Sequence, residues 1–295
     1  MNNKNTVPMK PALLRIEQLR PFEGHPYKVQ DNEEMAALSE SIRENGVLSP
    51  LIVRSVENSD EYEVISGHRR LYAARKAGLT EVPVLICTLD RDAAAIALVD
   101  SNLHREHILP SEKAFAYRLK AEALKHQGRR TDLTSGQAVP KSEDNRTTAE
   151  IGAVANESYK TVQRYIRLTY LIPELLEKMD KEEIAFSVGV EMSYLDEYSQ
   201  RDVLEQCEIN DCTPSYSQAW RMHKADREGL LTKDVIQFLM SEEKANQRET
   251  VKVPASRLRE VLPKGLDAGK TEDFIIKACE YYRKYLIRQR GREER

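Results

Sequence analysis

The sequence has few aromatic residues and few cysteines, and it has no long apolar run. Aromatic residues make up 6% of the 295 positions, and the four cysteines lie without metal-ligand spacing at Cys87, Cys207, Cys212 and Cys279. This cysteine pattern predicts a reduced chain without a disulfide framework. No apolar run approaches the ~20 residues that cross a bilayer, and the polar start MNNKNTVPMK lacks the apolar region of a signal peptide. We therefore expect a cytoplasmic protein.

The chain also lacks an excess of charge of one sign. Its formal net charge is -3, with 45 Lys and Arg against 48 Asp and Glu, whereas nucleic-acid binding needs clustered basic residues. The distribution of charge matters more than the sum. Residues 159–169 contain Lys160, Arg164 and Arg167 and no acid, and the chain is basic from Tyr281 onwards. Bulk charge therefore neither supports nor excludes DNA binding.

Strand and helix patterns alternate over residues 13–110 and predict an α+β N-terminal domain. A capping box at Asp31 begins a helix with one apolar face, which Gly46 ends. Pro83 indicates an edge position for the last strand, since proline cannot donate to a sheet ladder. The other expected elements are strands at residues 51–53, 62–64 and 82–86, helices at residues 71–77 and 91–100, and a polar turn at residues 101–105.

The rest of the chain is mostly helical in pattern. Residues 111–245 predict an α-helical domain whose first helix, residues 111–127, ends at Gly128 and is followed by a polar loop at residues 128–146. Residues 246–295 predict a C-terminal region with a short strand at residues 250–254 and an amphipathic helix at residues 271–288. The apolar side of that helix, which either packs on earlier helices or pairs with a second copy, comprises Phe274, Ile275, Ala278, Tyr282 and Tyr285.

Residues 147–169 predict a helix-turn-helix. Ile151 supplies an apolar residue in the first helix, and small Gly152 follows it where the two helices cross. Asn156 stands at the turn, where a left-handed backbone is needed that asparagine tolerates next after glycine. Val162 and Tyr165, or Ile166 in its place, then pack inward from the second helix. An ordinary two-helix hairpin in a bundle is the alternative explanation of this pattern.

The second helix of this motif carries the candidate DNA-binding residues. If Ser158 caps the helix, its exposed face presents groups that can reach base edges and phosphates in a major groove. These residues are Ser158, Tyr159, Lys160, Thr161, Gln163, Arg164 and Arg167.

A second constellation, Gly67-His68-Arg69-Arg70, stands between a predicted strand and a predicted helix. Glycine allows close approach of an anion, a helix N-terminus offers free amides, and arginines donate charge-assisted hydrogen bonds, which together suit a polyphosphate. An ordinary surface turn is the alternative. Asn102 and Arg105 in the polar turn could add contacts or be solvated residues at a helix end. His104 and His107 have no third ligand nearby and are taken as ordinary polar residues.

Several motifs occur in an order that resembles the ParB/RepB/Noc partition proteins. They are GVLSPLIV at residues 46–53, YEVISGHRRLYAARKAG at residues 62–78, SNLHRE at residues 101–106 and PSEKA at residues 110–114. The predicted helix-turn-helix follows in the place that it has in this family. The resemblance covers roughly residues 13–180. Beyond them, the chain shares with the family only a helical pattern and a C-terminal segment that could form a dimer.

The resemblance implies a mechanism. Members of the family bind a centromere-like DNA site through the helix-turn-helix, bind CTP with a divalent metal in the N-terminal domain, and close as a dimeric clamp on DNA. A ParA-type Walker ATPase moves the complex, and the N-terminal tail can touch it. The resemblance thus implies a homodimer on double-stranded DNA in the cytoplasm, associated with the nucleoid. The nucleotide-binding residues that it implies are Gly67, His68, Arg69, Arg70, Ser101, Asn102 and Arg105, with Asn102 also a candidate ligand of Mg²⁺.

Two positions depart from the family pattern. His68 stands where the phosphate motif usually has Glu, and Ser101 stands where a Glu commonly precedes the Asn. Carboxylates are preferred ligands of hard metals and can arrange an attacking water. The sequence therefore does not decide whether the nucleotide is hydrolysed. Asp100 could replace one of the lost carboxylates if its position shifted slightly. The altered motifs and the long polar loop favour a plasmid or other mobile element as the origin.

Two other functions remain open from the sequence. A transcriptional regulator or nucleoid-occlusion factor would share the DNA-binding apparatus and differ in its operators and partners. An ATP-using enzyme with the fold of sulfiredoxin or ParB-like kinases would leave the helix-turn-helix unexplained. Fold alone does not decide among these functions.

Overall fold

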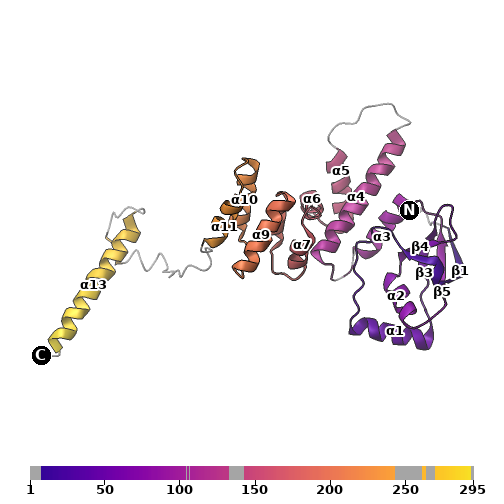
Figure 1. Cartoon of the computed structure of the whole chain (residues 1–295), viewed down its shortest axis with the longest axis horizontal. Coiled ribbons are helices and arrows are strands. Elements are labelled where there is room, and N and C mark those ends of the chain that lie inside the picture. The colour runs from indigo at the N-terminus through magenta and orange to yellow at the C-terminus, as the bar shows by residue number, and fades with distance from the viewer. Residues whose placement is uncertain are drawn as a thin grey trace. The chain divides into compact units, whose positions relative to one another are not determined.

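The computed structural model describes residues 8–103, 105, 107–132, 143–242, 261–263 and 270–293. The chain forms two compact units, Met1–Glu242 and Glu243–Arg295. Figure 1 shows the sheet and the helices of the first unit, and the long helix of the second. The predicted boundary near residue 110 within the first unit stays a prediction.

The N-terminal part of the first unit is built on a mixed five-stranded sheet with the strand order β1-β5-β3-β4-β2. Its strands are β1 (Met9–Arg15), β2 (Leu19–Pro21), β3 (Leu51–Ser55), β4 (Tyr62–Ser66) and β5 (Glu81–Cys87). The β1–β5 and β3–β4 pairs are antiparallel, whereas β2–β4 and β3–β5 are parallel. A 3-10 turn, η1 (Ile16–Gln18), joins β1 to β2. The expected mixture of strands and helices is therefore confirmed.

Helices pack on both faces of this sheet, because successive strand residues point to opposite sides. On one face, Leu51 and Val53 share a core with α1 (Glu33–Asn45) and α2 (His68–Lys76). On the other face, Ile52 and Ile65 share a core with α3 (Arg91–Asn102) and α4 (Pro110–Asp132). The turn between β4 and α2 and the end of α3 are thereby positioned by two separate cores.

Seven further helices complete the described part of the first unit. They are α5 (Glu143–Ala155), α6 (Tyr159–Leu168), α7 (Pro173–Asp180), α8 (Phe186–Met192), α9 (Glu197–Ile209), α10 (Tyr216–Arg227) and α11 (Lys233–Ser241). A core that includes Leu168, Met192 and Met222 holds α6, α8 and α10 together. Helix α4 joins the two parts of the unit, since Ala116 packs toward the sheet while Tyr117 packs on α5 and α6.

The second unit contains α13 (Thr271–Glu293), which starts where the sequence predicted a helix and runs five residues further. Of the predicted apolar side, Ile275 is half-buried, whereas Phe274, Ala278, Tyr282 and Tyr285 are exposed. The predicted strand at residues 250–254 lies outside the described residues.

Two predictions about the first helix and the last strand of the sheet are wrong. Asn32, not Asp31, caps α1 by accepting a hydrogen bond from the backbone N–H of Met35 at 3.1 Å. The Asp31 carboxylate instead accepts a hydrogen bond from Lys76 of α2, at 2.6 Å. Strand β5 lies inside the sheet, and Pro83 is tolerated because it pairs only with β1, one residue before pairing with β3 begins at Val84.

Three predicted helix limits also differ from the structure. Helix α2 begins at His68, because Gly67 turns the chain directly into the helix. Helix α3 continues to Asn102, so Ser101 and Asn102 belong to its last turn and not to a polar turn. Helix α4 runs through Gly128 to Asp132, since one glycine inside a helix costs only ~1 kcal/mol relative to alanine. Within the predicted polar loop, residues 133–142 lie outside the described residues.

Candidate functional site

The first candidate site is a small cavity of about 200 Å³ beside the turn between β4 and α2. Gly67 opens this turn with φ 106°, a backbone conformation that favours glycine, and a Cβ there would lie 3.0 Å from Leu51 Cγ. The cavity is formed by three segments of chain that are far apart in the sequence. Its lining comprises His25, Tyr27, Lys28, Val29, Ser66, Gly67, His68, Arg69, Ser101, Asn102 and Arg105.

A larger cavity of about 840 Å³ shares three cations with the small one, namely Lys28, Arg69 and Arg105. Its other polar lining includes four carboxylates, which belong to Glu34, Glu112, Asp180 and Glu182. Ligand cavities usually measure about 300–1,000 Å³. The larger cavity lies within this range and the small one below it, so a ligand that fills the small cavity and extends into the larger one would pass the three shared cations.

Each shared cation already contacts a neighbouring side chain. Arg69 donates to the Glu34 carboxylate at 3.0 Å, and Lys28 Nζ lies 3.1 Å from the Asp180 carboxylate. The Arg105 guanidinium lies 5.8 Å from the centre of the Tyr27 ring. These side chains are held near the cavity without being buried away from a ligand.

Two histidines whose rings are in contact, with an angle of 37° between their planes, form part of the cavity wall. The ring centres of His25 and His68 are 3.6 Å apart. Burial, together with the neighbouring His25, lowers the pKa of His68 to about 3. Burial also lowers the pKa of His25 to about 4. Both imidazoles are therefore neutral near pH 7.

Two buried polar atoms of this wall have no hydrogen-bond partner among the described residues. They are the hydroxyl of Tyr27 and Nε2 of His68. A buried polar atom without a partner costs roughly 1–3 kcal/mol. Neither atom is open to solvent in this structure, so a bound molecule would reach them only after a shift of the cavity wall.

The last turn of α3 contributes two of the predicted residues. The Asn102 amide nitrogen donates to the backbone carbonyl of Leu98 at 2.8 Å, which leaves its Oδ1 as the atom that can reach a ligand. Asp100, the substitute carboxylate suggested by the sequence, forms an ion pair with Lys120, whose side chain is almost fully buried. Asp100 does not line either of the two cavities.

Arg70 differs from the other predicted nucleotide-binding residues, because it does not line either of the two cavities. Its guanidinium donates to the backbone carbonyl of Pro50 at 2.8 Å and also to that of Ser49. Arg70 thus holds the start of β3 against α2, whereas the other six predicted residues come together in the small cavity.

The second candidate site lies on the α5–α6 pair. Gly152 lies at the crossing of the two helices, where a Cβ would approach the Glu157 carbonyl oxygen to 2.5 Å. Asn156 has φ 56°, the left-handed conformation expected of the turn. Ser158 caps α6 by accepting a hydrogen bond from the Thr161 backbone N–H at 3.1 Å. Val162 is fully buried, as predicted.

The turn between these helices is attached to α4. The Glu157 carboxylate accepts a hydrogen bond from the Tyr117 hydroxyl at 3.0 Å and forms an ion pair with Lys113. Tyr117 is fully buried between α4 and the pair. This attachment orients the outer face of α6 relative to the N-terminal part of the unit.

The predicted reading face of α6 divides into exposed and half-buried positions. Ser158, Tyr159, Lys160 and Arg164 are exposed, while Thr161 and Gln163 are half-buried. Arg167 differs from the expected exposed position, because its guanidinium donates to the Ser193 carbonyl at 2.7 Å. It also lies over the rings of Tyr170 and Tyr194, at 4.5 and 4.2 Å.

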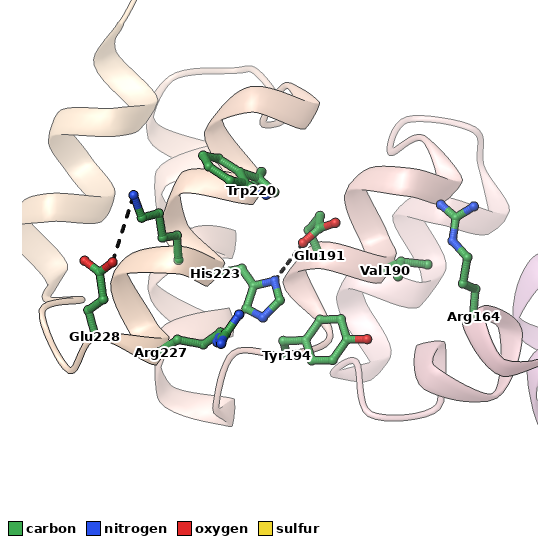
Figure 2. A pocket seen from close by; sticks show the side chains of 9 residues that line it. Arg164, Val190, Glu191, Tyr194, Trp220, His223, Arg227 and Glu228 are labelled. Atoms are coloured by element: carbon green, nitrogen blue, oxygen red, sulfur yellow. Dashed lines mark hydrogen bonds and ion pairs between the residues drawn. The ribbon is translucent and has the colours of Figure 1, made fainter. Parts of the chain in front are cut away.

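A groove of about 610 Å³ continues from Arg164 across α8 to α10. Figure 2 shows Arg164 at one side of it and Trp220, His223 and Arg227 at the other, with His223 directed at Glu191. The His223 and Tyr194 rings are stacked with centres 4.3 Å apart. The groove combines aromatic faces with basic side chains beside the predicted reading helix.

Sequence reasoning missed several residues of both sites. His25, Tyr27 and Lys28 lie in a segment without regular structure, and the one local signal was an aromatic and basic cluster next to Pro26. Trp220 and Arg227 were hidden in an ordinary helical pattern. Chain folding alone brings both groups beside the predicted residues.

Metal ligands and membrane spans can be assessed for the described residues. Among them, no three His, Cys, Asp or Glu side chains are grouped so that they could hold a metal ion. His107 lines the larger cavity, whereas His104 lies outside the described residues. None of the helices searched is both long and apolar enough to cross a membrane.

Comparisons with known proteins identify one matching family model and several similar proteins. The ParB N-terminal domain family model matches residues 2–103. The chain is 33% identical over 199 residues to a probable plasmid-partitioning protein ParB of Deinococcus radiodurans, covering 65% of this chain and 67% of that protein. It is 43% identical over 137 residues to a probable chromosome 1-partitioning protein ParB of the same organism, covering 46% of this chain and 45% of that protein.

Two further similarities complete the comparison. A nucleoid occlusion protein of Geobacillus thermodenitrificans is 39% identical over 103 residues, covering 35% of this chain and 36% of that protein. The chain thus spans less than half the length of this relative and of the chromosome 1 protein. The crystal structure of C-terminally truncated ParB from Caulobacter crescentus, complexed to the centromeric parS site, is 20% identical with a TM-score of 0.41, covering 72% of this chain and 98% of that one.

Proposed function

Because this chain belongs to the ParB family of partition proteins, we propose that it binds a centromere-like DNA site through α5 and α6. We further propose that the two N-terminal cavities bind a nucleoside triphosphate, CTP, which acts as a switch on a dimeric DNA clamp. Hydrolysis of the nucleotide is not part of the proposal.

The outer face of α6 carries the DNA-binding part of this proposal. Lys160 and Arg164 are exposed on a helix whose start is capped by Ser158 and whose partner helix crosses at Gly152. Such a helix can enter a major groove with basic groups at base edges and phosphates. The proposed DNA-binding residues are Ser158, Tyr159, Lys160, Thr161, Gln163 and Arg164, while Arg167 supports the helix.

The nucleotide-binding part rests on the chemistry of the small cavity. Gly67, His68 and Arg69 line it together with Ser101, Asn102 and Arg105 from the end of α3. A free helix N-terminus and several cations favour a polyphosphate.

The remaining parts of the proposal concern assembly. The exposed apolar side of α13 is proposed to pair with a second copy, with residues 246–295 as the dimerisation region. Residues 13–110 and 111–245 are proposed as the nucleotide-binding and DNA-binding domains. A ParA-type Walker ATPase is the proposed partner, and the cytoplasmic nucleoid is the proposed location.

DNA binding can be tested by selecting sites from genomic fragments with the purified chain, followed by fluorescence anisotropy on the selected site. Lys160→Ala and Arg164→Ala are expected to weaken that binding, whereas Arg201→Ala on the distant helix α9 serves as the control. Selection of no site above bulk DNA would contradict the proposal. Calorimetry with CTP, and with ATP, GTP and UTP as controls, tests the nucleotide part separately.

A nucleoid-occlusion function is the second candidate, favoured by the 39% identity to a protein of that name. It would use the same DNA-binding face with a different partner. The test is whether the purified chain stimulates ATP hydrolysis by a ParA-type protein encoded beside it. Stimulation favours partition, whereas its absence with intact site-specific DNA binding favours the second candidate.

A further inference from the structure

The lining of the small cavity contains cations and no carboxylate. Lys28, Arg69 and Arg105 carry positive charge, while the other polar lining groups are imidazoles, hydroxyls and one amide. Magnesium in proteins is usually held by one or two carboxylates together with phosphate oxygens and waters. Asn102 Oδ1 is a single neutral ligand, which does not meet that requirement.

Three of the four carboxylates of the neighbouring cavity are already engaged. Glu34 is paired with Arg69 at 3.0 Å. Glu112 accepts hydrogen bonds from the backbone N–H groups of Lys28 at 2.7 Å and Leu109 at 3.2 Å.

Asp180 is engaged in the same way. Its carboxylate accepts from both the hydroxyl and the backbone N–H of Ser111 and is paired with Lys28. Glu182, the remaining carboxylate of the larger cavity, does not line the small one. No group of three metal-ligating acids, histidines or cysteines occurs in the described parts of the chain.

Positive charge at the shared wall has two consequences. It repels a divalent cation, since like charges a few ångströms apart repel each other more strongly in a partly desolvated site than in water. It also attracts phosphate oxygens directly, because guanidinium and ammonium groups form strong charge-assisted hydrogen bonds with them. The wall therefore suits the anion and not the metal.

We propose that this chain binds the polyphosphate of its nucleotide without a divalent metal, with Lys28, Arg69 and Arg105 supplying the positive charge. The Arg69 guanidinium has five N–H donors and the Lys28 ammonium three, so each can donate to phosphate while it keeps its pairing with Glu34 or Asp180. This inference rests on the nucleotide binding proposed above, and it goes beyond it by assigning the charge to three side chains.

The experiment is calorimetry of CTP binding to the full chain, once with magnesium and once with EDTA at equal ionic strength. CTP is expected to bind in EDTA at least as tightly as in magnesium, because magnesium neutralises part of the phosphate charge that the three side chains recognise. Binding more than about tenfold weaker in EDTA, a loss of ~1.4 kcal/mol, overturns the inference. That result would leave the proposed function intact, whereas no CTP binding in either buffer would overturn both.

A variant that adds the missing carboxylate sharpens the test. His68→Glu brings an acid into the cavity wall, and its CTP binding is expected to fall at least about tenfold in EDTA and to recover with magnesium. Ala37→Glu adds the same charge on the exposed face of α1 and is expected to bind CTP equally in both buffers. An Arg105→Gln chain that regains CTP binding with magnesium would show that a metal can replace the side chain and would contradict the inference.

Discussion

The small cavity and the outer face of α6 are both basic, but they are built in different ways. The face of α6 consists of neighbouring residues on a single helix, held from below by Gly152 and Glu157. The cavity takes its lining from three separate segments, and two of its three cations, Lys28 and Arg69, are paired with acids of other elements. The face of α6 therefore depends on the local geometry of the α5–α6 pair, whereas the small cavity depends on the packing of the whole N-terminal region.

Helix α4 connects the two sites. Its first turn contributes Ser111 and Glu112, which hold Asp180 and the backbone of Lys28. Further along, Lys113 and Tyr117 hold Glu157 in the turn before α6. A change in the pairing of Lys28 therefore acts on residues next to those that orient α6.

The largest effect is expected from a larger side chain at the crossing of α5 and α6. In Gly152→Val the added side chain meets the Glu157 carbonyl, so we expect the free energy of unfolding to fall by about 1–3 kcal/mol and specific DNA binding to be lost. Denaturant unfolding and anisotropy measure the two effects. CTP binding should persist, and Val154→Ala on the exposed side of α5 is the control. Unchanged DNA affinity would show that the helix pair accepts a larger side chain at position 152 without displacing α6.

Substitution of two arginines of α6 should distinguish a residue that contacts DNA from one that stabilises the helix. Arg164→Ala is expected to weaken specific DNA binding by ~1–3 kcal/mol and to lower thermal stability only slightly, through the lost contact of its guanidinium with the Phe186 ring, 4.9 Å away. Arg167→Ala should lower thermal stability as well, because its guanidinium joins Tyr170, Tyr194 and the Ser193 carbonyl. Anisotropy and thermal unfolding of both variants give the comparison. Equal losses in both measurements would place the two arginines in one role.

Acid should destabilise the cavity through its histidines. Since the folded pKa of His68 is about 3 and that of His25 about 4, the unfolded chain binds more protons below pH ~6.5. Stability is therefore expected to fall as the pH decreases from ~6.5 towards 4, by at most about 1.4 kcal/mol per pH unit for His68. Chemical denaturation at several pH values measures this slope. His68→Gln should make it shallower, and an unchanged slope would remove His68 as the cause.

The smallest effect is expected from the groove beside α6. If DNA extends from Arg164 towards Arg227, Arg227→Ala should weaken binding about equally for specific and bulk DNA. The dependence of log affinity on log salt should lose about one unit of slope, as for one phosphate contact. Anisotropy over a salt series is the measurement, with Lys233→Ala on α11 as the control. Identical slopes would confine the DNA to α6.

Local sequence patterns predicted most helices and the capped turn before α6, but they missed the first two strands and the true limits of α2, α3 and α4. Pro83 indicated an edge and stands within an inner strand, since its missing donor falls just outside the pairing with β3. Asp31 looked like a cap and instead meets Lys76, a residue 45 positions away. Such contacts depend on residues distant in the sequence, which short-range patterns do not contain.

The sequence by itself determined the left-handed turn at Asn156, the cap at Ser158 and the small residue at the helix crossing, because each is a local requirement of backbone geometry. The order of motifs also determined the family. Only the tertiary structure placed His25, Tyr27 and Lys28 beside Gly67. It also directed the Arg70 side chain to the Pro50 carbonyl outside the cavity, and the Arg167 side chain to the rings of Tyr170 and Tyr194. Those positions follow from packing and charge pairing between segments that are distant in the sequence, so a short-range pattern does not contain them.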